Sequence, residues 1–237
     1  MKIGEARAII GSLSFPSKMP GTSYGLPASA CITGAKLAEI PGTVCNICYA
    51  LGRTKYQWPL AQKGMHKRLA AIEHPQWVEA MTRLLLHVHS KPRIRVDLGL
   101  VGVRLQRKGG TRHRFNPTGF HRWHDSGDLQ SVEHLAKICE VARRTPRIKH
   151  WLPTNELGLV KAYLATGATI PRNFVIRVSS IMIDDPVRRD WPTTSSVFTE
   201  KPPADAHICP APQQGHRCQD CRACWSNLFP HVAYEAH

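Results

Sequence analysis

Four cysteines near the C-terminus have the spacing of a metal-binding site. They are Cys209, Cys218, Cys221 and Cys224. The pattern C-x8-C-x2-C-x2-C can hold tetrahedral zinc, or a [4Fe-4S] cluster in which the protein binds every iron. His207 or His216 can replace one of the cysteines, so the ligand set stays open. We expect a metal at this tail; the alternative is a run of free thiols.

A second cysteine set lies nearer the N-terminus and consists of Cys31, Cys45 and Cys48. Thirteen residues separate the first two, and the last two form a C-x2-C step. Three thiolates leave one coordination position open, as radical chemistry on S-adenosylmethionine requires. Such enzymes usually carry a tight C-x3-C-x2-C loop, so two other interpretations stay open here: zinc completed by a histidine, or core cysteines without a metal.

Polar residues also follow a predicted strand in the middle of the chain. The strand Phe120–His124 runs into the turn Asp125-Ser126-Gly127-Asp128. Ligands bind at the carboxyl ends of strands in α/β sheets and barrels. We therefore expect Asp125 to hold a base, a ribose or a proton, whereas Asp128 either does the same or caps the next helix. Further candidate substrate-binding residues here are His124, Ser126, Gly127 and Gln130.

The next two predicted strands bring further polar residues to the same edge. Thr154 and Glu156 follow one of them, and Ser179 follows the other. Glu156 is a candidate general base or nucleophile; the alternative is a solvated carboxylate favoured by the dipole of a helix start. Arg177, within the later strand, can clamp an anion.

Strands and helices must alternate to place these residues together. Predicted helices cover Leu60–Glu73, Pro75–His89, Ser131–Arg144 and Leu157–Ala165, and predicted strands cover Arg93–Leu98, Phe120–His124, Ile148–Leu152 and Phe174–Val178. This alternation indicates βαβ units and a parallel sheet. We expect an α/β fold, a full or partial barrel of βα units with a cysteine-rich metal-binding C-terminal tail. Residues 1–29 would form an irregular arm, residues 30–205 the catalytic or binding domain with the first cysteine set, and residues 206–237 the tail.

The net charge indicates a nucleic-acid partner. The 32 Lys and Arg residues outnumber the 17 Asp and Glu residues, which gives +15. Six of the cations lie between Leu98 and His124, a stretch without any acidic residue. A surface of this kind suits a phosphate backbone, and a solvated basic loop is the alternative. The six are Arg104, Arg107, Lys108, Arg112, Arg114 and Arg122.

The cysteines and the apolar runs also bear on the compartment. No stretch reaches the roughly 18–20 apolar residues of a membrane span. The first fifteen residues carry Glu5 and Arg7 and lack the apolar core of a signal peptide. We therefore expect a cytoplasmic protein with no membrane partner, in which the eight cysteines stay reduced and serve as metal ligands or redox centres.

As a set, these motifs resemble one family. The order of Cys31, Cys45-x2-Cys48-Tyr49-Ala50, the run Arg122–Asp128, Leu152-Pro153-Thr154-x-Glu156 and the final Cys224-Trp225 is similar to that of the phage gene-product-88-like proteins. The resemblance covers about Ala30 to His237. It implies a phage protein that acts in the cytoplasm of the host.

A shorter likeness points to a reaction. Asp125-Ser126-Gly127-x-x-Gln130 is similar to the D-S-G-G-F-Q motif of the guanine transglycosylases, which are barrels with a cysteine-rich zinc site; their phage relatives exchange guanine in DNA for a 7-deazaguanine base. The likeness implies that Asp125 contacts the base, and that Glu156 or Asp184 supplies the nucleophilic carboxylate. Asp128 stands where that motif has its second glycine, and the tail lacks the C-x-C-x2-C pattern followed by histidine.

These observations lead to one functional prediction and two rivals. We predict a nucleic-acid-modifying enzyme, a glycosyltransferase that exchanges guanine in DNA for a small purine-like base. One rival is an iron–sulfur redox enzyme related to the radical S-adenosylmethionine type, with a cluster on the first cysteine set. The other is a non-catalytic nucleic-acid-binding metalloprotein. The oligomeric state stays open.

Overall fold

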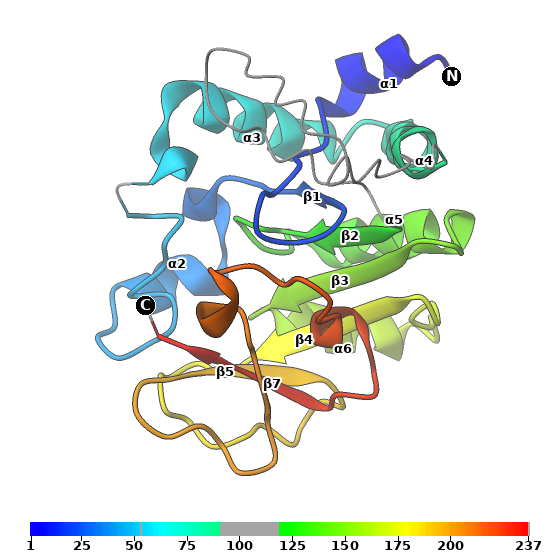
Figure 1. Ribbon diagram of the computed structural model, residues 1–237. Helices are drawn as coiled ribbons and strands as arrows, with labels where there is room; N and C mark the ends of the chain where they lie inside the picture. Colours follow the sequence, from blue (N-terminus) through cyan, green and yellow to red (C-terminus); the bar gives the residue numbers. More distant parts are fainter. Residues whose placement is uncertain (53, 91–118, 237) are drawn as a thin grey trace, which may run out of the picture.

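Seven short strands form one sheet in the computed structural model, which describes residues 1–52, 54–90 and 119–236 (Figure 1). Every pair of neighbouring strands is parallel, and the order is β1-β2-β3-β4-β5-β7-β6. The strands are β1 (Thr22–Tyr24), β2 (Phe120–Trp123), β3 (Lys149–Thr154), β4 (Phe174–Ser179), β5 (Thr194–Phe198), β6 (His207–Ile208) and β7 (His231–Glu235). The fold is therefore α/β, and all carboxyl ends of the strands meet at one edge.

The helices lie before or between the first four strands, and most of them pack against one face of the sheet (Figure 1). They are α1 (Ile3–Ile10), α2 (Thr33–Ala38), α3 (Pro59–Ala71), α4 (Trp77–His89), α5 (Val132–Arg144) and α6 (Leu157–Ala165). Helices α1, α4, α5 and α6 pack side by side in that order. Local signals set their ends: Pro59 occupies the first turn of α3, and the Ser131 side chain caps α5 by accepting a hydrogen bond from the His134 amide at 3.0 Å.

The two faces of the sheet pack against different partners. On β2, Trp123 points into the helix-side core, whereas Phe120 belongs to a second apolar cluster on the opposite face. On β3, Leu152 belongs to the helix-side core and Trp151 to the second cluster, because successive side chains of a strand point to opposite faces. The second cluster is completed by Trp225 from the C-terminal segment, which lies in front of the sheet in Figure 1.

The structure confirms the predicted elements in the middle of the chain. The helix expected over Leu157–Ala165 is α6 at the same residues, and the other described predictions agree to within about two residues at each end. The predicted strand Arg93–Leu98 lies outside the described residues. The short elements β5, β6 and β7 were not predicted.

Two expectations were wrong. Residues 1–29 are not an irregular arm, because α1 packs on α4 and β1 forms an edge of the sheet. The sheet is open and not a barrel: within the described residues, its edge strands β1 and β6 pair with one neighbour each. These strands have only three and two residues, and the tail packs on the face that a closed barrel would enclose. The tail is also part of the sheet, through β6 and β7.

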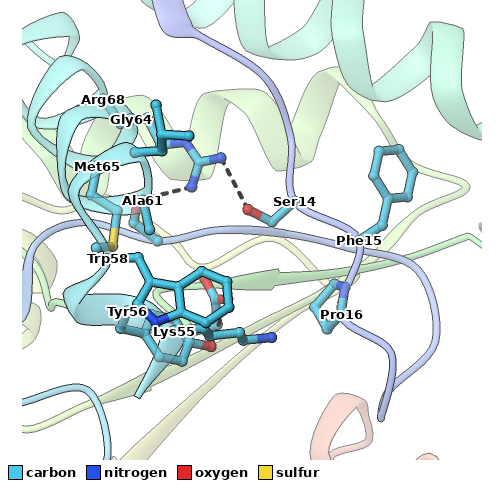
Figure 2. Close-up of a pocket in the computed structure, with 13 residues that line it drawn as sticks. Ser14, Phe15, Pro16, Lys55, Tyr56, Trp58, Ala61, Gly64, Met65 and Arg68 are labelled. Atoms are coloured by element: carbon cyan, nitrogen blue, oxygen red, sulfur yellow. Dashed lines mark hydrogen bonds between the residues drawn. The ribbon is translucent and has the colours of Figure 1, made fainter. Parts of the chain in front are cut away.

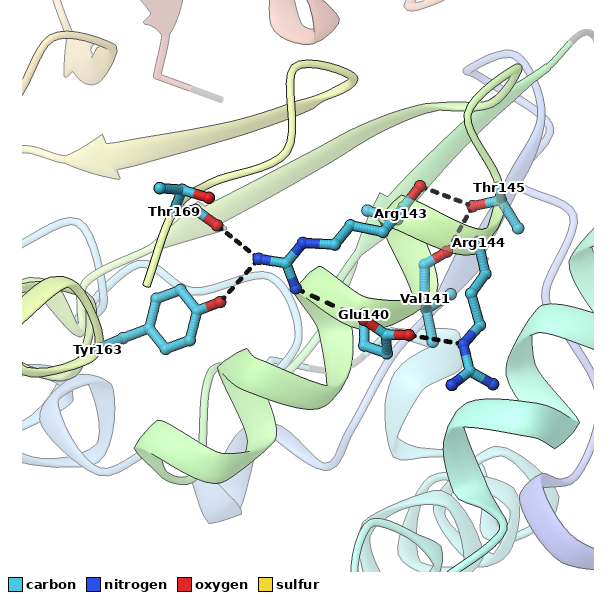
Figure 3. Close-up of polar contacts among 8 residues, drawn as sticks. Glu140, Val141, Arg143, Arg144, Thr145, Tyr163 and Thr169 are labelled. Atoms are coloured by element: carbon cyan, nitrogen blue, oxygen red, sulfur yellow. Dashed lines mark hydrogen bonds and ion pairs between the residues drawn. The ribbon is translucent and has the colours of Figure 1, made fainter. Parts of the chain in front are cut away.

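Surface polar contacts fix the exposed ends of α5 (Figure 3). Glu140 pairs with Arg143 at 3.6 Å and with Arg144 at 2.7 Å. Arg143 also donates to the Thr169 carbonyl oxygen at 2.8 Å and so ties α5 to the segment after α6. Exposed pairs of this kind stabilise a fold by about 1 kcal/mol or less.

Among the described helices, none is long and apolar enough to cross a membrane.

A group of buried histidines lies between the sheet and the helices. Thr22 Oγ1 is 2.8 Å from His121 Nδ1, and Trp123 Nε1 donates to His150 Nδ1 at 3.2 Å. Burial lowers the pKa of His134 and of His150 to about 3, and that of His89 to about 4. Burial likewise lowers the pKa values of His121 and His124 well below the usual value. The folded protein therefore keeps these imidazoles neutral.

We predict that acid destabilises this fold steeply. Because the folded-state pKa values lie below the unfolded value of about 6.5, the unfolded chain binds more protons than the folded one. The stabilisation is present above about pH 6.5 and is lost as the pH falls toward about 4, by up to about 1.4 kcal/mol per pH unit for each histidine. Urea unfolding at pH 7, 6 and 5 measures this slope. His134→Gln should reduce this slope by the contribution of about one proton, and the exposed His66→Gln should leave the slope unchanged. A free energy of unfolding that stays the same between pH 7 and pH 5 would contradict the prediction.

Candidate functional site

Three loops meet at the carboxyl edge of the sheet, after β1, β2 and β3. The first carries Cys31, Cys45 and Cys48, and the second carries Asp125. Backbone hydrogen bonds hold the two together: the Leu26 amide donates to the Ser126 carbonyl oxygen at 2.8 Å. The sequence analysis expected Asp125, Thr154 and Glu156 to follow parallel strands at one edge, and β2 and β3 are parallel; that the first cysteine set also lies at this edge was not predicted.

Asp125 is the carboxylate that faces a pocket at this edge. Its side chain is only 8% exposed, and Oδ2 accepts a hydrogen bond from the Tyr56 hydroxyl at 3.1 Å. The other oxygen, Oδ1, is buried and has no hydrogen-bond partner among the described residues. A buried acceptor without a partner costs about 1–3 kcal/mol, so the Asp125 carboxylate keeps one unused hydrogen-bond acceptor beside the pocket.

The pocket has aromatic and cationic walls. Trp58 and Lys55 come from the start of α3 and the turn before it, whereas Phe15 comes from the N-terminal segment on the opposite side (Figure 2). Trp58 is 68% exposed and Phe15 is 50% exposed, which is unusual for large apolar side chains. The cavity measures about 350 Å³ and lies within the range of about 300–1,000 Å³ that is typical of small-molecule sites.

Arg68 joins the pocket wall to the N-terminal segment. Its guanidinium donates to the Ser12 carbonyl oxygen at 2.6 Å. The same group donates to Ser14 Oγ at 3.0 Å (Figure 2). It also donates to the Gly25 carbonyl oxygen at 3.3 Å, beside Asp125. Phe15, the residue after Ser14, is thereby held across the cavity from α3.

Close backbone packing sets the position of Asp125. A Cβ at Gly25 would lie 2.5 Å from Asp125 Oδ1, so only glycine allows the carboxylate to sit there. His124, directly before it, has a positive φ of 53°, which reverses the chain after β2. The Tyr49 hydroxyl donates to the Asp125 carbonyl oxygen at 2.5 Å. Tyr49 and Tyr56 both come from the loop that carries Cys45 and Cys48.

Most other residues of the motif support the loop. His124 is buried with its ring centroid 5.3 Å from that of His134, on the helix side. Gly127 has a φ of 77°, and a Cβ there would lie 2.6 Å from Leu26. Gln130 donates from Nε2 to the Ala30 carbonyl oxygen at 3.1 Å. Ser126 is buried, and none of these four residues lines the pocket.

Asp128 is a second buried carboxylate, but it is well bonded. Oδ1 accepts from the Leu129 amide at 2.8 Å and from Thr154 Oγ1 at 2.6 Å, and Oδ2 accepts from the Asn155 amide at 2.8 Å. Burial raises the pKa of Asp128 to about 7 although these hydrogen bonds oppose the shift. Ser131, and not Asp128, caps α5. The hydrogen bonds of Asp128 instead join the loop after β2 to the loop after β3.

The two candidate nucleophiles have partners away from the pocket. Glu156 accepts from both the amide and the hydroxyl of Thr33, each at 2.7 Å, at the start of α2. Asp184, which is exposed, accepts from the amide of Thr199 at 2.8 Å and from its hydroxyl at 2.7 Å. Neither carboxylate lines the cavity around Asp125.

The first cysteine set lies beside Asp128 and Glu156. Burial raises the pKa of Cys31 to about 12 and that of Cys45 to about 11, and the charges of Asp128 and the other thiols add to both shifts. A Cβ at Gly34 would lie 3.1 Å from Cys31 Cβ, a tight contact, and 3.5 Å from Cys31 Sγ and Cys45 Sγ, so α2 packs closely on these two cysteines. Asn155 Nδ2 donates to Cys45 Sγ at 3.4 Å.

The tail cysteines share one segment on the other face of the sheet. Cys224 is buried with Sγ 3.2 Å from the Tyr234 hydroxyl, and Cys221 Sγ is 3.4 Å from His207 Nε2. Burial raises the pKa of Cys218 to about 11, helped by the charges of Cys209 and Cys221. The donor chemistry of both sets suits zinc or an iron–sulfur cluster. Over residues 1–52, 54–90 and 119–236, however, no three His, Cys, Asp or Glu side chains converge into a group that could hold a metal ion.

Arg177 holds the tail against the sheet. The side chain is fully buried and donates to carbonyl oxygens of β5 and of the C-terminal segment. The acceptors are Thr194 at 2.8 Å, Phe229 at 3.1 Å, Ala223 at 3.2 Å, Ser226 at 3.3 Å and Pro230 at 3.4 Å. It therefore binds backbone where the sequence analysis expected it to clamp an anion. Ser179 Oγ lies 3.5 Å from Ser195 Oγ, also away from the pocket.

The basic residues divide into two groups. Arg104, Arg107, Lys108, Arg112 and Arg114 lie outside the described residues. Arg122 is half-buried, with its guanidinium 4.6 Å from the centre of the Trp151 ring. Burial acts to lower the pKa of Arg122, but the neighbouring Tyr49 and Asp125 raise it overall.

The sequence analysis missed the pocket walls. Phe15, Gly25, Tyr56, Trp58 and Arg68 belong to no recognised motif, and they surround Asp125 only after β1, α3 and β2 come together. One signal was available: the chain has no acidic residue from Ile40 to Ile72, a stretch that contains Trp58-Pro59 and several cations.

A family model described as Gene product 88 matches residues 4–227 of this chain. The match includes both cysteine sets, the loop with Asp125 and the whole pocket. No curated protein and no solved structure matches the chain.

We predict that Arg177→Met loosens the C-terminal segment. Hydrogen bonds from a charged donor contribute about 1.5–3 kcal/mol each, and the change leaves several buried carbonyl oxygens unpaired, so we expect a loss of about 3 kcal/mol or more. Urea unfolding gives the total, and hydrogen exchange should show faster exchange in residues 223–235. The matched control is Arg143→Met, an exposed arginine that should cost less than about 1 kcal/mol. Equal effects of the two substitutions would contradict this role for Arg177.

Proposed function

The chain belongs to the Gene product 88 family, and we propose that it takes a purine base of a nucleic acid into the pocket beside Asp125 and exchanges it. The observation that carries the proposal is the Asp125 carboxylate on the lining of a cavity with aromatic walls, with one oxygen that has no hydrogen-bond partner among the described residues. Guanine presents two N–H donors on one edge, and a carboxylate is the acceptor that fits them. Trp58 and Phe15 offer flat surfaces for the faces of the base.

Positive charge around the cavity supports a nucleic-acid substrate. Lys55 and Arg68 line the pocket, and the net charge of the chain is +15. Among the described residues that line the cavity, Asp125 is the one carboxylate. We assign it the contact with the base that leaves and with the base that enters.

Base exchange needs no oxidant or reductant. The bond between the sugar carbon and guanine breaks, the bond between the same carbon and the incoming 7-deazaguanine base forms, and one proton passes from the incoming base to the released guanine. The first cysteine set takes no part in this scheme.

Isotope-labelled 7-deazaguanine and guanine-containing DNA test the proposal. The wild-type protein should incorporate label, and Asp125→Asn should lose it because an amide cannot accept two N–H donors as a carboxylate does. The lost charged hydrogen bonds should weaken base binding roughly 10- to 100-fold. Asp205→Asn changes an exposed carboxylate just before the tail, is the charge-matched control and should be fully active.

A second substitution separates a blocked pocket from a damaged fold. Gly64 lines the cavity from α3, and a Cβ there meets nothing within 4 Å. Gly64→Leu should fill the cavity and abolish incorporation, while the protein gains up to about 1 kcal/mol because leucine favours the helix over glycine. Incorporation that survives both Gly64→Leu and Asp125→Asn would exclude this pocket as the reaction site.

We also propose that the tail cysteines bind a structural metal, zinc or a [4Fe-4S] cluster. The proposal rests on their spacing and on their position within one segment packed on the sheet. Binding would have to draw the thiols closer together than they lie here. With four thiolates as ligands, the metal has no open position for a substrate.

Metal analysis and a visible spectrum of anaerobically purified protein test this assignment. We expect one tightly bound metal that raises the thermal midpoint and that Cys221→Ser removes. The buried Cys139→Ser is the control and should retain the metal. A colourless protein with zinc excludes the cluster, a brown protein with iron establishes it, and a protein that neither carries nor takes up metal contradicts the proposal.

A further inference from the structure

One face of α3 combines the pocket with exposed positive charge. Leu60, Lys63, Gly64 and Lys67 follow the spacing i, i+3, i+4, i+7, which places them on the same side of a helix. Leu60 and Gly64 line the cavity, and the two lysines between and beyond them are exposed. The cations therefore lie in a row that begins at the mouth of the pocket.

An exposed aromatic ring stands at the end of this row. Trp58 is 68% exposed, at the N-terminus of α3, and Leu60 beside it is 86% exposed. Neither side chain contributes to the two apolar cores. Exposed apolar side chains bordered by cations are typical of a binding surface.

No acidic residue interrupts this surface along the chain. From Ile40 to Ile72 the sequence contains lysine and arginine but neither aspartate nor glutamate. Lys63 and Lys67 form none of the ion pairs found in the described part of the chain. Both ammonium groups are therefore available to an anionic partner.

We propose that this face of α3, defined by Trp58, Leu60, Lys63 and Lys67, binds single-stranded nucleic acid. The phosphates lie along Lys63 and Lys67, and an unpaired base stacks on Trp58 next to the pocket. This inference rests on the proposed function, since it describes how the strand that carries the exchanged base reaches Asp125. It specifies the substrate as an unpaired strand, because bases stacked inside a duplex cannot reach Trp58.

The test uses fluorescently labelled oligothymidine, which contains no purine and therefore reports on the strand surface and not on the pocket. Anisotropy titrations at several salt concentrations give the affinity and its salt dependence. Lys63→Ala combined with Lys67→Ala should reduce the slope of log K against log salt by about 1.4, since each phosphate contact on a single strand contributes about 0.7. Trp58→Ala should weaken binding roughly 5- to 150-fold at constant slope.

A charge-matched control removes two lysines elsewhere. Lys149 lies at the start of β3, on the opposite edge of the sheet from Asp125, and Lys161 lies on α6. Lys149→Ala combined with Lys161→Ala should leave the slope unchanged.

A duplex of the same sequence gives the decisive comparison. We expect it to bind more weakly than the single strand and to be insensitive to Trp58→Ala. Duplex binding as tight as single-strand binding would overturn the inference, as would a slope that the α3 lysines do not change. Because oligothymidine binding does not require Asp125, Asp125→Asn should leave it intact, so a failed base exchange and a failed strand surface give different results.

Discussion

The buried guanidinium of Arg177 connects the parts of this molecule that sequence places far apart. It has no carboxylate partner among the described residues and binds five backbone carbonyl oxygens instead. Those contacts fix residues 223–230 over the sheet, and Trp225 from this segment donates to the His121 carbonyl oxygen at 3.0 Å. His121 belongs to β2, and Asp125 lies in the loop that follows this strand. The geometry of the pocket thus depends on a charge that lies on the other face of the sheet.

The sheet divides the molecule into regions with different chemistry. Its helix side is dry and contains neutral imidazoles, which explains why that side would tolerate acid poorly. Its other face is covered by the cysteine-rich tail, which leaves the carboxyl edge as the place where polar side chains reach a cavity. Even there, most carboxylates are occupied: Asp128 and Glu156 join loops and helices, and Asp125 alone keeps an oxygen without a partner among the described residues.

Sequence periodicity predicted the elements whose stability is largely local. The helix α6 was predictable because its apolar spacing specifies it, whereas the cap of α5 is Ser131 and not Asp128, which the sequence analysis had offered. The strands β1 and β6 were not predictable, since three or two residues carry no period and exist only through their neighbours. The same distinction applies to the site. Asp125 follows a recognisable strand, whereas Trp58 and Phe15 meet only through tertiary packing. The hydrogen bonds of the Glu156 carboxylate, and all but one of those of the Arg177 side chain, cross more than forty residues of sequence.

The loop with Cys45 and Cys48 reaches Asp125 through two tyrosines. Tyr49 holds the backbone of Asp125 and Tyr56 holds its carboxylate, so the loop and the pocket cannot rearrange separately. Ligands bound at two sites joined in this way would be thermodynamically linked, and the linkage would be reciprocal. A ligand on the thiols that ordered the cysteine loop would change the affinity of the pocket by some factor. Occupancy of the pocket would then change the affinity of the thiols for that ligand by the same factor.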